Sequence, residues 1–195
     1  MSEHIHKYDD GIKRCRWPGN DALYLDYHDT EWGVPVFGDD EMFERIALEG
    51  FQAGLSWITI LKRREGFRKA FKNFEVKKVA KLTDADVEKM MQNEGIIRNR
   101  AKIISTINNA NLVLELQKQG ISISDVVWSF SPKKKMTSTK DFQWRATSPE
   151  SDAMSKELRR LGFSFVGSTT MYALMQATGL INDHAPGCFR RNDLA

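Results

Sequence analysis

The chain has 195 residues and a formal net charge of +3, with 41% hydrophobic and 28% charged residues. This balance is typical of a globular protein, and we expect residues 1–195 to form a single domain of two packed helical lobes. The sequence offers neither the run of about 20 apolar residues that a membrane helix needs nor the apolar core of a signal peptide, so we expect a cytoplasmic protein. The small positive charge permits an anionic partner without requiring one.

Helical periodicity dominates the sequence, and the alternation of apolar and polar residues that is typical of strands is rare. The aromatic-rich N-terminal arm is expected to be irregular. A first helix is expected to open at Asp39–Asp40 and continue over residues 41–50. A second is expected within residues 54–71, with Ser56 as its N-terminal cap.

The second half of the chain is expected to carry four more helices that end at glycines or polar segments. Their ranges are 83–95, 98–119, 150–162 and 169–178, with Ile104, Ile107 and Leu114 on one side of the longest. A polar loop is expected over residues 131–148, and an irregular tail is expected after residue 178. The sequence therefore predicts an all-α fold.

Both cysteines of the chain lie near histidines, close to its two ends. Cys15 and His28 belong to the N-terminal arm, and His184 and Cys188 belong to the C-terminal tail. Cysteine and histidine are the usual ligands of a four-coordinate structural zinc, and one ion would fix two irregular segments to each other. The alternative is two buried thiols and two ordinary histidines, and spacing alone does not decide between them.

Several aromatic residues of the first third of the chain are candidates for a ligand pocket, since aromatic rings stack on nucleobases. They are Trp17, Tyr24, Tyr27, Trp32 and Trp57. The alternative is that these rings form a core around an irregular arm.

Glu49 falls at the margin of the apolar side of its predicted helix, and Gly50 and Gly54 follow it. A carboxylate at a helix end can reach into a pocket, whereas the alternative is a solvated surface glutamate. Aromatic faces attract cations, and a carboxylate accepts hydrogen bonds from an amine. These residue types suit a cationic, electron-poor base that has been extruded from a duplex.

The segment NEGIIRNRAKI joins two predicted helices through Gly95. Such a hairpin presents backbone N–H groups and a helix N-terminus to a phosphate, and Arg98, Arg100 and Lys102 add positive charge nearby. Contacts of this kind fix the register on DNA without reading its sequence. The alternative is that the glycine only ends a helix.

With these motifs, the chain resembles the bacterial DNA-3-methyladenine glycosylase I family of the helix-hairpin-helix glycosylase superfamily. The likeness runs from about Arg14 to Cys188 and is carried by RCRWPGNDALYLDYHDTEWGVP, FERIALEGFQAGLSWITILKRRE, GIIRNRAKI, VWSF, GFSFVG and NDHAPGC. It implies the helix-hairpin-helix glycosylase fold with termini tied together by one structural Zn²⁺. It also implies base excision repair by monofunctional hydrolysis of the N-glycosidic bond of alkylated bases in double-stranded DNA. The products would be an abasic site and, chiefly, free 3-methyladenine.

The resemblance also implies a role for each group of candidate residues. It makes Glu49 the catalytic residue that contacts the flipped base and Leu55 the residue that enters the gap left in the duplex. The remaining assignments are pocket walls at Trp17, Tyr24, Tyr27 and Trp57, DNA contacts at Gly95, Arg98, Arg100 and Lys102, and zinc ligands at Cys15, His28, His184 and Cys188.

Two features depart from what the wider superfamily would suggest. Many of its members place a catalytic Asp after the hairpin, but no Asp occurs here between Asp86 and Asp125. This lack is shared with the family that the chain resembles and fits a substrate whose glycosidic bond is already labile. Nothing singles out a Schiff-base lysine, so no strand cleavage is expected. Phe51 stands where the family would carry a polar residue such as Gln, which is expected to alter pocket packing or DNA contact.

Two other classes of function stay open at this point. One is a zinc-stapled module that recognises lesions without cutting, and the other is a metalloenzyme that uses the Cys/His residues for catalysis. Four complete protein ligands argue against the metalloenzyme, because a catalytic zinc usually keeps a water. We expect a monomer, since a glycosylase needs only one face for DNA.

Overall fold

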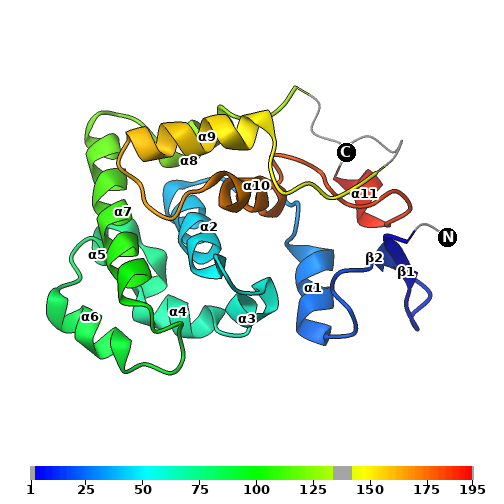
Figure 1. Ribbon diagram of the computed structural model, residues 1–195, viewed down its shortest axis with the longest axis horizontal. Coiled ribbons are helices and arrows are strands. Elements are labelled where there is room, and N and C mark those ends of the chain that lie inside the picture. Colours follow the sequence, from blue (N-terminus) through cyan, green and yellow to red (C-terminus); the bar gives the residue numbers. More distant parts are fainter. Residues whose placement is uncertain (1–2, 134–141, 195) are drawn as a thin grey trace.

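The structure is a computed structural model that describes residues 3–133 and 142–194. It is mostly helical, as the sequence predicts (Figure 1). In chain order its elements are β1 (Ile5–Lys7), β2 (Lys13–Cys15), α1 (Ala22–Thr30), α2 (Asp39–Gln52), α3 (Trp57–Leu61), α4 (Arg64–Ala70), the short 3-10 helix η1 (Lys72–Phe74), α5 (Val76–Val79), α6 (Asp84–Met91), α7 (Arg100–Lys118), α8 (Ile123–Trp128), α9 (Pro149–Arg160), α10 (Ser168–Ala177) and α11 (Arg190–Asp193).

Helix α2 occupies the middle of the helical body and contacts α3, α7, α8 and α10 (Figure 1). Three acidic residues open it, where the positive end of the helix dipole favours them. Its apolar residues are buried almost throughout, from Met42 and Phe43 to Phe51. Because α2 is packed on several sides, its last turn is held in one position relative to its neighbours.

The N-terminal arm is more regular than predicted. Strands β1 and β2 form an antiparallel hairpin in which Ile5 pairs with Cys15, so the all-α prediction was wrong for this segment. Three-residue strands are too short to show an alternating pattern in the sequence. Helix α1 follows, and the Asp21 side chain caps it by accepting from the N–H groups of Leu23 and Tyr24.

Two further predictions about helices need correction. The helix predicted within residues 54–71 is two helices, α3 and α4, because Arg63 adopts φ −106° and ψ 1° and turns the chain. Ser56 precedes α3, but its hydroxyl pairs with that of Thr59 at 2.7 Å instead of capping a backbone N–H. The C-terminal tail, predicted to be irregular, contains α11. Part of the predicted loop 131–148 lies outside the described residues.

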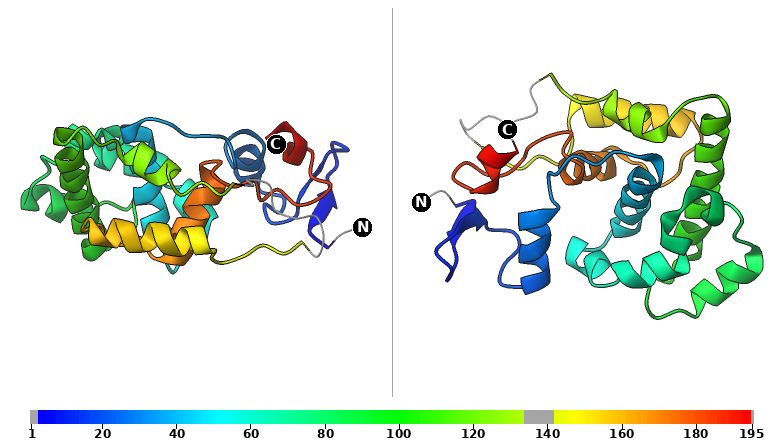
Figure 2. Two further views of the ribbon diagram at one scale, coloured as in Figure 1. Left: turned by 90° about the horizontal axis from the view of Figure 1, so that it is seen from above. Right: turned by 180° about the vertical axis from the view of Figure 1, so that it is seen from behind.

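The two ends of the chain lie side by side. The β1–β2 hairpin, α1 and α11 gather at one end of the molecule, beside the helical body (Figures 1 and 2). The N–H of Phe189 donates to the carbonyl of Lys13 at 3.0 Å, which joins the C-terminal segment to strand β2. None of the described helices is both long and apolar enough to cross a lipid bilayer.

Candidate functional site

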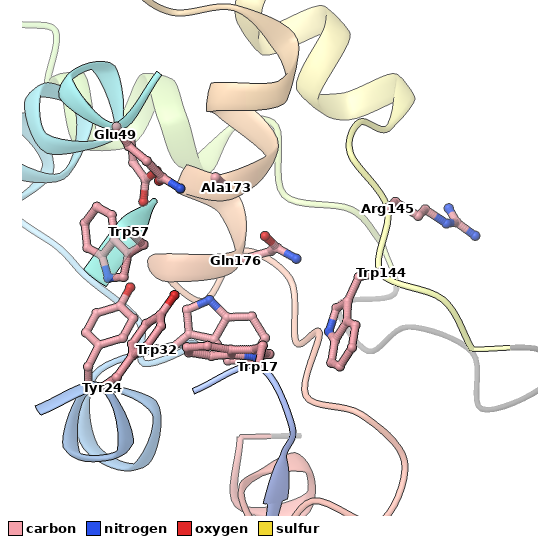
Figure 3. A pocket seen from close by; sticks show the side chains of 11 residues that line it. Trp17, Tyr24, Trp32, Glu49, Trp57, Trp144, Arg145, Ala173 and Gln176 are labelled. Carbon is pink, nitrogen blue, oxygen red and sulfur yellow. The ribbon is translucent and has the colours of Figure 1, made fainter. Parts of the chain in front are cut away.

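A pocket of about 340 Å³ opens between the N-terminal arm, the end of α2 and helix α10 (Figure 3). This volume lies within the range of small-molecule sites. Its lining residues are Trp17, Tyr24, Tyr27, Trp32, Glu49, Gln52, Trp57, Trp144, Arg145, Ala173 and Gln176. The four aromatic residues that the resemblance assigns to a pocket are therefore together in one, with Glu49 among them.

Aromatic rings from the arm and from α3 form one side of the pocket. The ring centroids of Trp17 and Tyr24 are 4.8 Å apart, and those of Tyr27 and Trp57 are 5.4 Å apart. Trp17 also contacts Trp32 edge-on at 5.0 Å. Such packing fixes the orientation of each ring, so the pocket presents apolar walls of defined shape to a flat ligand.

Glu49 reaches the pocket from the last turns of α2 and is only 4% exposed. Its Oε2 atom has no hydrogen-bond partner among the described residues. Burial raises the pKa of Glu49 to about 8, and the charge of Arg45, one helical turn earlier, partly opposes this rise. A buried acceptor without a partner is costly, so Glu49 is poised to accept a hydrogen bond from a ligand.

The indole and the phenols beside Glu49 are hydrogen-bond donors. The Nε1 atom of Trp57 is buried and has no partner among the described residues. Burial and the charge of Glu49 raise the pKa of Tyr24 to about 12, and the same two causes raise the pKa of Tyr27. Both phenols therefore keep their protons at neutral pH, and the pocket combines neutral donors with one carboxyl group.

The opposite wall contains residues that the sequence did not single out. Gln176 of α10 donates its Nε2–H to Oδ2 of Asp183 at 2.8 Å, and the Tyr172 hydroxyl donates to the same oxygen at 2.8 Å. The Trp144 indole donates to the carbonyl of Asp183 at 3.0 Å. Because a carboxylate only accepts, Asp183 binds the nitrogen of the Gln176 amide, and the amide oxygen on this pocket-lining side chain is not engaged by Asp183 (Figure 3).

The four predicted metal ligands form one buried cluster, although they come from opposite ends of the chain. Sγ of Cys188 lies 3.5 Å from both Nε2 of His28 and Nδ1 of His184, and Sγ of Cys15 lies 3.8 Å from Nδ1 of His184. All four ligand atoms lie within 4.8 Å of one another. Usual zinc–ligand distances in a tetrahedron give sulfur–nitrogen separations of roughly 3.5 Å, so the donor set and spacing fit a bound metal ion.

Outer hydrogen bonds hold the ligands of this cluster. Nδ1 of His28 lies 2.7 Å from a carboxylate oxygen of Asp29, and Nε2 of His184 lies 3.1 Å from the carbonyl of Trp32. The N–H of Ala185 donates to Sγ of Cys15 at 3.3 Å. Partners of this kind orient metal-bound imidazoles. Four buried protein ligands leave no open position for a reacting water, which argues against a catalytic metal.

The segments assigned to DNA contact lie outside the pocket. Leu55 is 43% exposed in the turn between α2 and α3, next to the pocket residue Gln52. The hairpin between α6 and α7 places Gly95 and Arg98 at the surface. Arg100 is also exposed, but both of its terminal nitrogens donate to Glu88 at 2.7 Å. Among the residues that the structure describes, Arg98 has a loose ion pair with Glu94 at 3.9 Å, so its charge is the more available of the two.

Two residues are placed differently from what we predicted. Lys102 is 7% exposed, and its ammonium group donates to the carbonyls of Phe51 and Ala53, so the prediction that it adds charge for a phosphate was wrong. Phe51 packs against Phe67 and Phe71 in the core and does not line the pocket. It follows Glu49 by two residues, which turns it to the opposite side of α2.

The fold and the site define a helical protein with an aromatic pocket that contains one buried carboxyl group. The chain belongs to the methyladenine glycosylase family, whose pattern matches residues 17–191. It is 48% identical over 177 residues to a DNA-3-methyladenine glycosylase of Haemophilus influenzae, which covers 90% of this chain and 96% of the relative. The predicted family resemblance is therefore confirmed.

Solved structures of this family agree with the fold. A crystal structure of a 3-methyladenine DNA glycosylase I superposes with a TM-score of 0.86 at 47% identity, covering 90% of this chain and 98% of that one. The 3-methyladenine DNA glycosylase I of Staphylococcus aureus, solved to show how it recognises 3-methyladenine, gives 0.84 at 32% identity, with 91% and 96% covered.

Proposed function

We propose that this chain is a DNA glycosylase that hydrolyses the N-glycosidic bond of 3-methyladenine in double-stranded DNA and leaves an abasic site. Family membership and the identity to DNA-3-methyladenine glycosylases over most of the chain support the activity. The observation that carries the site assignment is the buried carboxyl of Glu49 inside an aromatic pocket, with no partner for its Oε2 in the part of the chain that the structure describes.

The pocket chemistry suits this substrate. Methylation at N3 leaves the base cationic, and aromatic faces attract cations. Tyr27 and Trp57 lie beside Glu49 and supply such faces. A cation next to Glu49 favours its ionised form, which accepts hydrogen bonds from the exocyclic amine. An undamaged adenine is neutral, so it gives the buried Glu49 carboxylate no positive charge to interact with and is bound less well.

The reaction requires little acid catalysis. The bond between C1′ and N9 breaks, its electron pair passes to the base, and the base departs as a neutral molecule. A water oxygen then bonds to C1′ and releases a proton. We assign to Glu49 the binding of the base and electrostatic stabilisation of the sugar cation that develops at C1′.

Nucleotide extrusion and DNA binding fall to the segments outside the pocket. We propose that the side chain of Leu55 fills the gap that the flipped nucleotide leaves in the duplex, because Leu55 is exposed on a turn beside the pocket. The hairpin between α6 and α7 would grip the phosphates as a helix-hairpin-helix. The first N–H groups of a helix lack intrahelical acceptors, and at the start of α7 the Asn99 side chain accepts from the N–H of Lys102, one turn in, which supports this role for the N–H groups before it. One such face is enough for a monomer to act.

The Cys/His cluster is proposed to hold one structural Zn²⁺ through Cys15, His28, His184 and Cys188. Zinc would neutralise the buried thiolates and tie strand β2 and helix α1 to the C-terminal segment. The ion takes no part in bond breaking, since all four ligands come from the protein.

Product analysis tests the proposed function. The purified protein is incubated with methylated duplex DNA, and the released bases are identified by chromatography. Release of 3-methyladenine is expected, with little release by Glu49→Gln and full release by Glu41→Gln, which changes an exposed glutamate of the same helix. If folded wild type binds the methylated duplex but releases no base, the chain is a lesion-binding module and not an enzyme.

A further inference from the structure

Helix α7 carries a row of buried polar side chains on the face that it turns toward α2. They are Lys102, Ser105, Thr106 and Asn109. With Phe165 and the last turn of α2, they line a small cleft that is separate from the base pocket. A helix face packed into a protein is usually apolar, so this row calls for a role that packing alone does not supply.

Lys102 uses its ammonium group to cap the end of α2. Nζ donates to the carbonyl of Phe51 at 2.9 Å and to that of Ala53 at 2.6 Å, and it lies 5.8 Å from the ring centre of Phe165. The last carbonyls of a helix lack intrahelical partners and form the negative end of its dipole. A buried ammonium is costly without such partners, so Lys102 is fixed to this spot.

The two carbonyls that Lys102 caps belong to the residues at which the turn that carries Leu55 begins. The N–H of Leu55 donates to the carbonyl of Gln52 at 2.6 Å, and Gly54 adopts φ +84°, a conformation that suits glycine. The turn therefore has few bonds of its own that set its position. The cap at Phe51 and Ala53 adds a direct polar link from this turn to α7, beside the packing of α2 against that helix.

The same helix face also fixes the loop that carries a second exposed apolar side chain, Phe165, which lies close to Gly50 in the last turn of α2. The Asn109 amide exchanges two hydrogen bonds of 3.1 Å with the backbone of Ser164. The next residue, Phe165, adopts φ +58° and is 38% exposed. A bulky residue in this left-handed conformation is strained, so it persists because Asn109 and the packing around it fix the loop.

We propose that Lys102 is a positioning residue for nucleotide extrusion: it holds the Leu55 turn in register with the hairpin that begins α7. The inference rests on the proposed function, because it needs Leu55 to enter the duplex. Lys102 follows the hairpin residue Asn99 by one helical turn. Helix α7 therefore links the hairpin that is proposed to bind the DNA phosphates to the turn that carries Leu55. Displacing such a group by about 1 Å costs on the order of 10²-fold in rate.

The test compares extrusion with base binding. Lys102→Met removes the donors and keeps the length of the side chain, and Lys118→Met, at the exposed far end of α7, is the matched control. Single-turnover excision from a duplex with one 3-methyladenine is expected to fall about 10- to 100-fold in Lys102→Met only. Affinity for free 3-methyladenine, measured by tryptophan fluorescence, is expected to stay at the wild-type value because the base pocket does not include Lys102.

A double-mutant cycle shows whether Lys102 acts through Leu55. In a Leu55→Ala background, Lys102→Met is expected to cause little further loss, since the side chain that it positions is already missing. Lys102→Arg keeps the charge and several donors, so this variant is expected to fold even if Lys102→Met does not. Its excision rate is expected to fall below that of wild type, but by less than in Lys102→Met.

Three results would overturn the inference. They are equal excision rates for Lys102→Met and Lys118→Met, losses that add in the double mutant, and a loss of free-base affinity that matches the loss of rate. The last would show a merely structural role. If wild type itself releases no base, the proposed function fails, and the extrusion role of Lys102 fails with it.

Discussion

The indole of Trp32 lies edge-on against the imidazole of His184, with ring centroids 4.5 Å apart. Trp32 lines the base pocket, and His184 belongs to the Cys/His cluster. Trp17 makes a similar contact with the ring of His28 at 5.4 Å. The cluster that joins the two ends of the chain therefore also supports one wall of the pocket.

Metal removal is predicted to weaken both stability and base binding. One Zn²⁺ per chain with two sulfur and two nitrogen ligands is expected by elemental analysis and X-ray absorption. Chelation is expected to lower the free energy of unfolding by several kcal/mol. At roughly 2–4 °C per kcal/mol for a chain of this size, Tm would fall by about 10 °C or more. Affinity for free 3-methyladenine should fall with it, because Trp17 and Trp32 lose their support. An unchanged Tm and affinity in metal-free protein would contradict this account.

The raised pKa of Glu49 is predicted to make stability depend on pH. Between its usual pKa of 4.5 and the folded-state value of about 8, the folded protein keeps a proton that the unfolded chain has released. Stability therefore falls as pH rises through this window, by a few kcal/mol.

Glu49→Gln removes this dependence, so its free energy of unfolding should exceed that of wild type increasingly from pH 5 to pH 8.5. Urea unfolding at several pH values measures the difference, and Glu41→Gln is the control. Parallel profiles for wild type and Glu49→Gln would show that Glu49 is solvated.

Gln176 is predicted to contribute to base recognition from the wall opposite the aromatic residues. Asp183 takes its amide N–H, so its oxygen is left to accept from the exocyclic amine of the base. Gln176→Leu keeps the size but removes the acceptor, which costs about 1–3 kcal/mol when the partner stays buried.

Excision of 3-methyladenine by Gln176→Leu should therefore fall about tenfold or more, whereas the exposed Gln119→Leu should match wild type. Titration of each variant with free base separates binding from chemistry. Equal affinities of wild type and Gln176→Leu for the free base would show that Gln176 does not contribute to base recognition.

The sequence singles out the Cys/His residues and Glu49 as candidates because chemistry restricts such positions to few residue types. Cysteines near histidines and a glutamate among aromatic residues are rare enough to notice. Gln176 and Trp144 escape notice because an amide on a helix and an indole in a polar loop have many uses. Only their common partner, Asp183, brings them into one wall.

Tertiary contacts decide the features that the sequence misplaces. Lys102 follows two arginines in a basic segment, so the local pattern predicts a phosphate contact. The carbonyls of Phe51 and Ala53 that bind it lie far away in the sequence. Likewise, the β1–β2 hairpin depends on pairing between short strands and on contact with the C-terminal segment, as in the bond from Phe189 to Lys13.

The excision rate of Glu49→Gln shows whether the Glu49 carboxyl takes part in base release. Single-turnover release of 3-methyladenine from a duplex would be measured beside the affinity of each protein for that duplex. We expect a loss of roughly 10²- to 10³-fold in rate, as for the removal of one electrostatic stabiliser, with DNA affinity mostly kept. A rate near that of wild type would contradict the assignment of Glu49 and of the pocket around it.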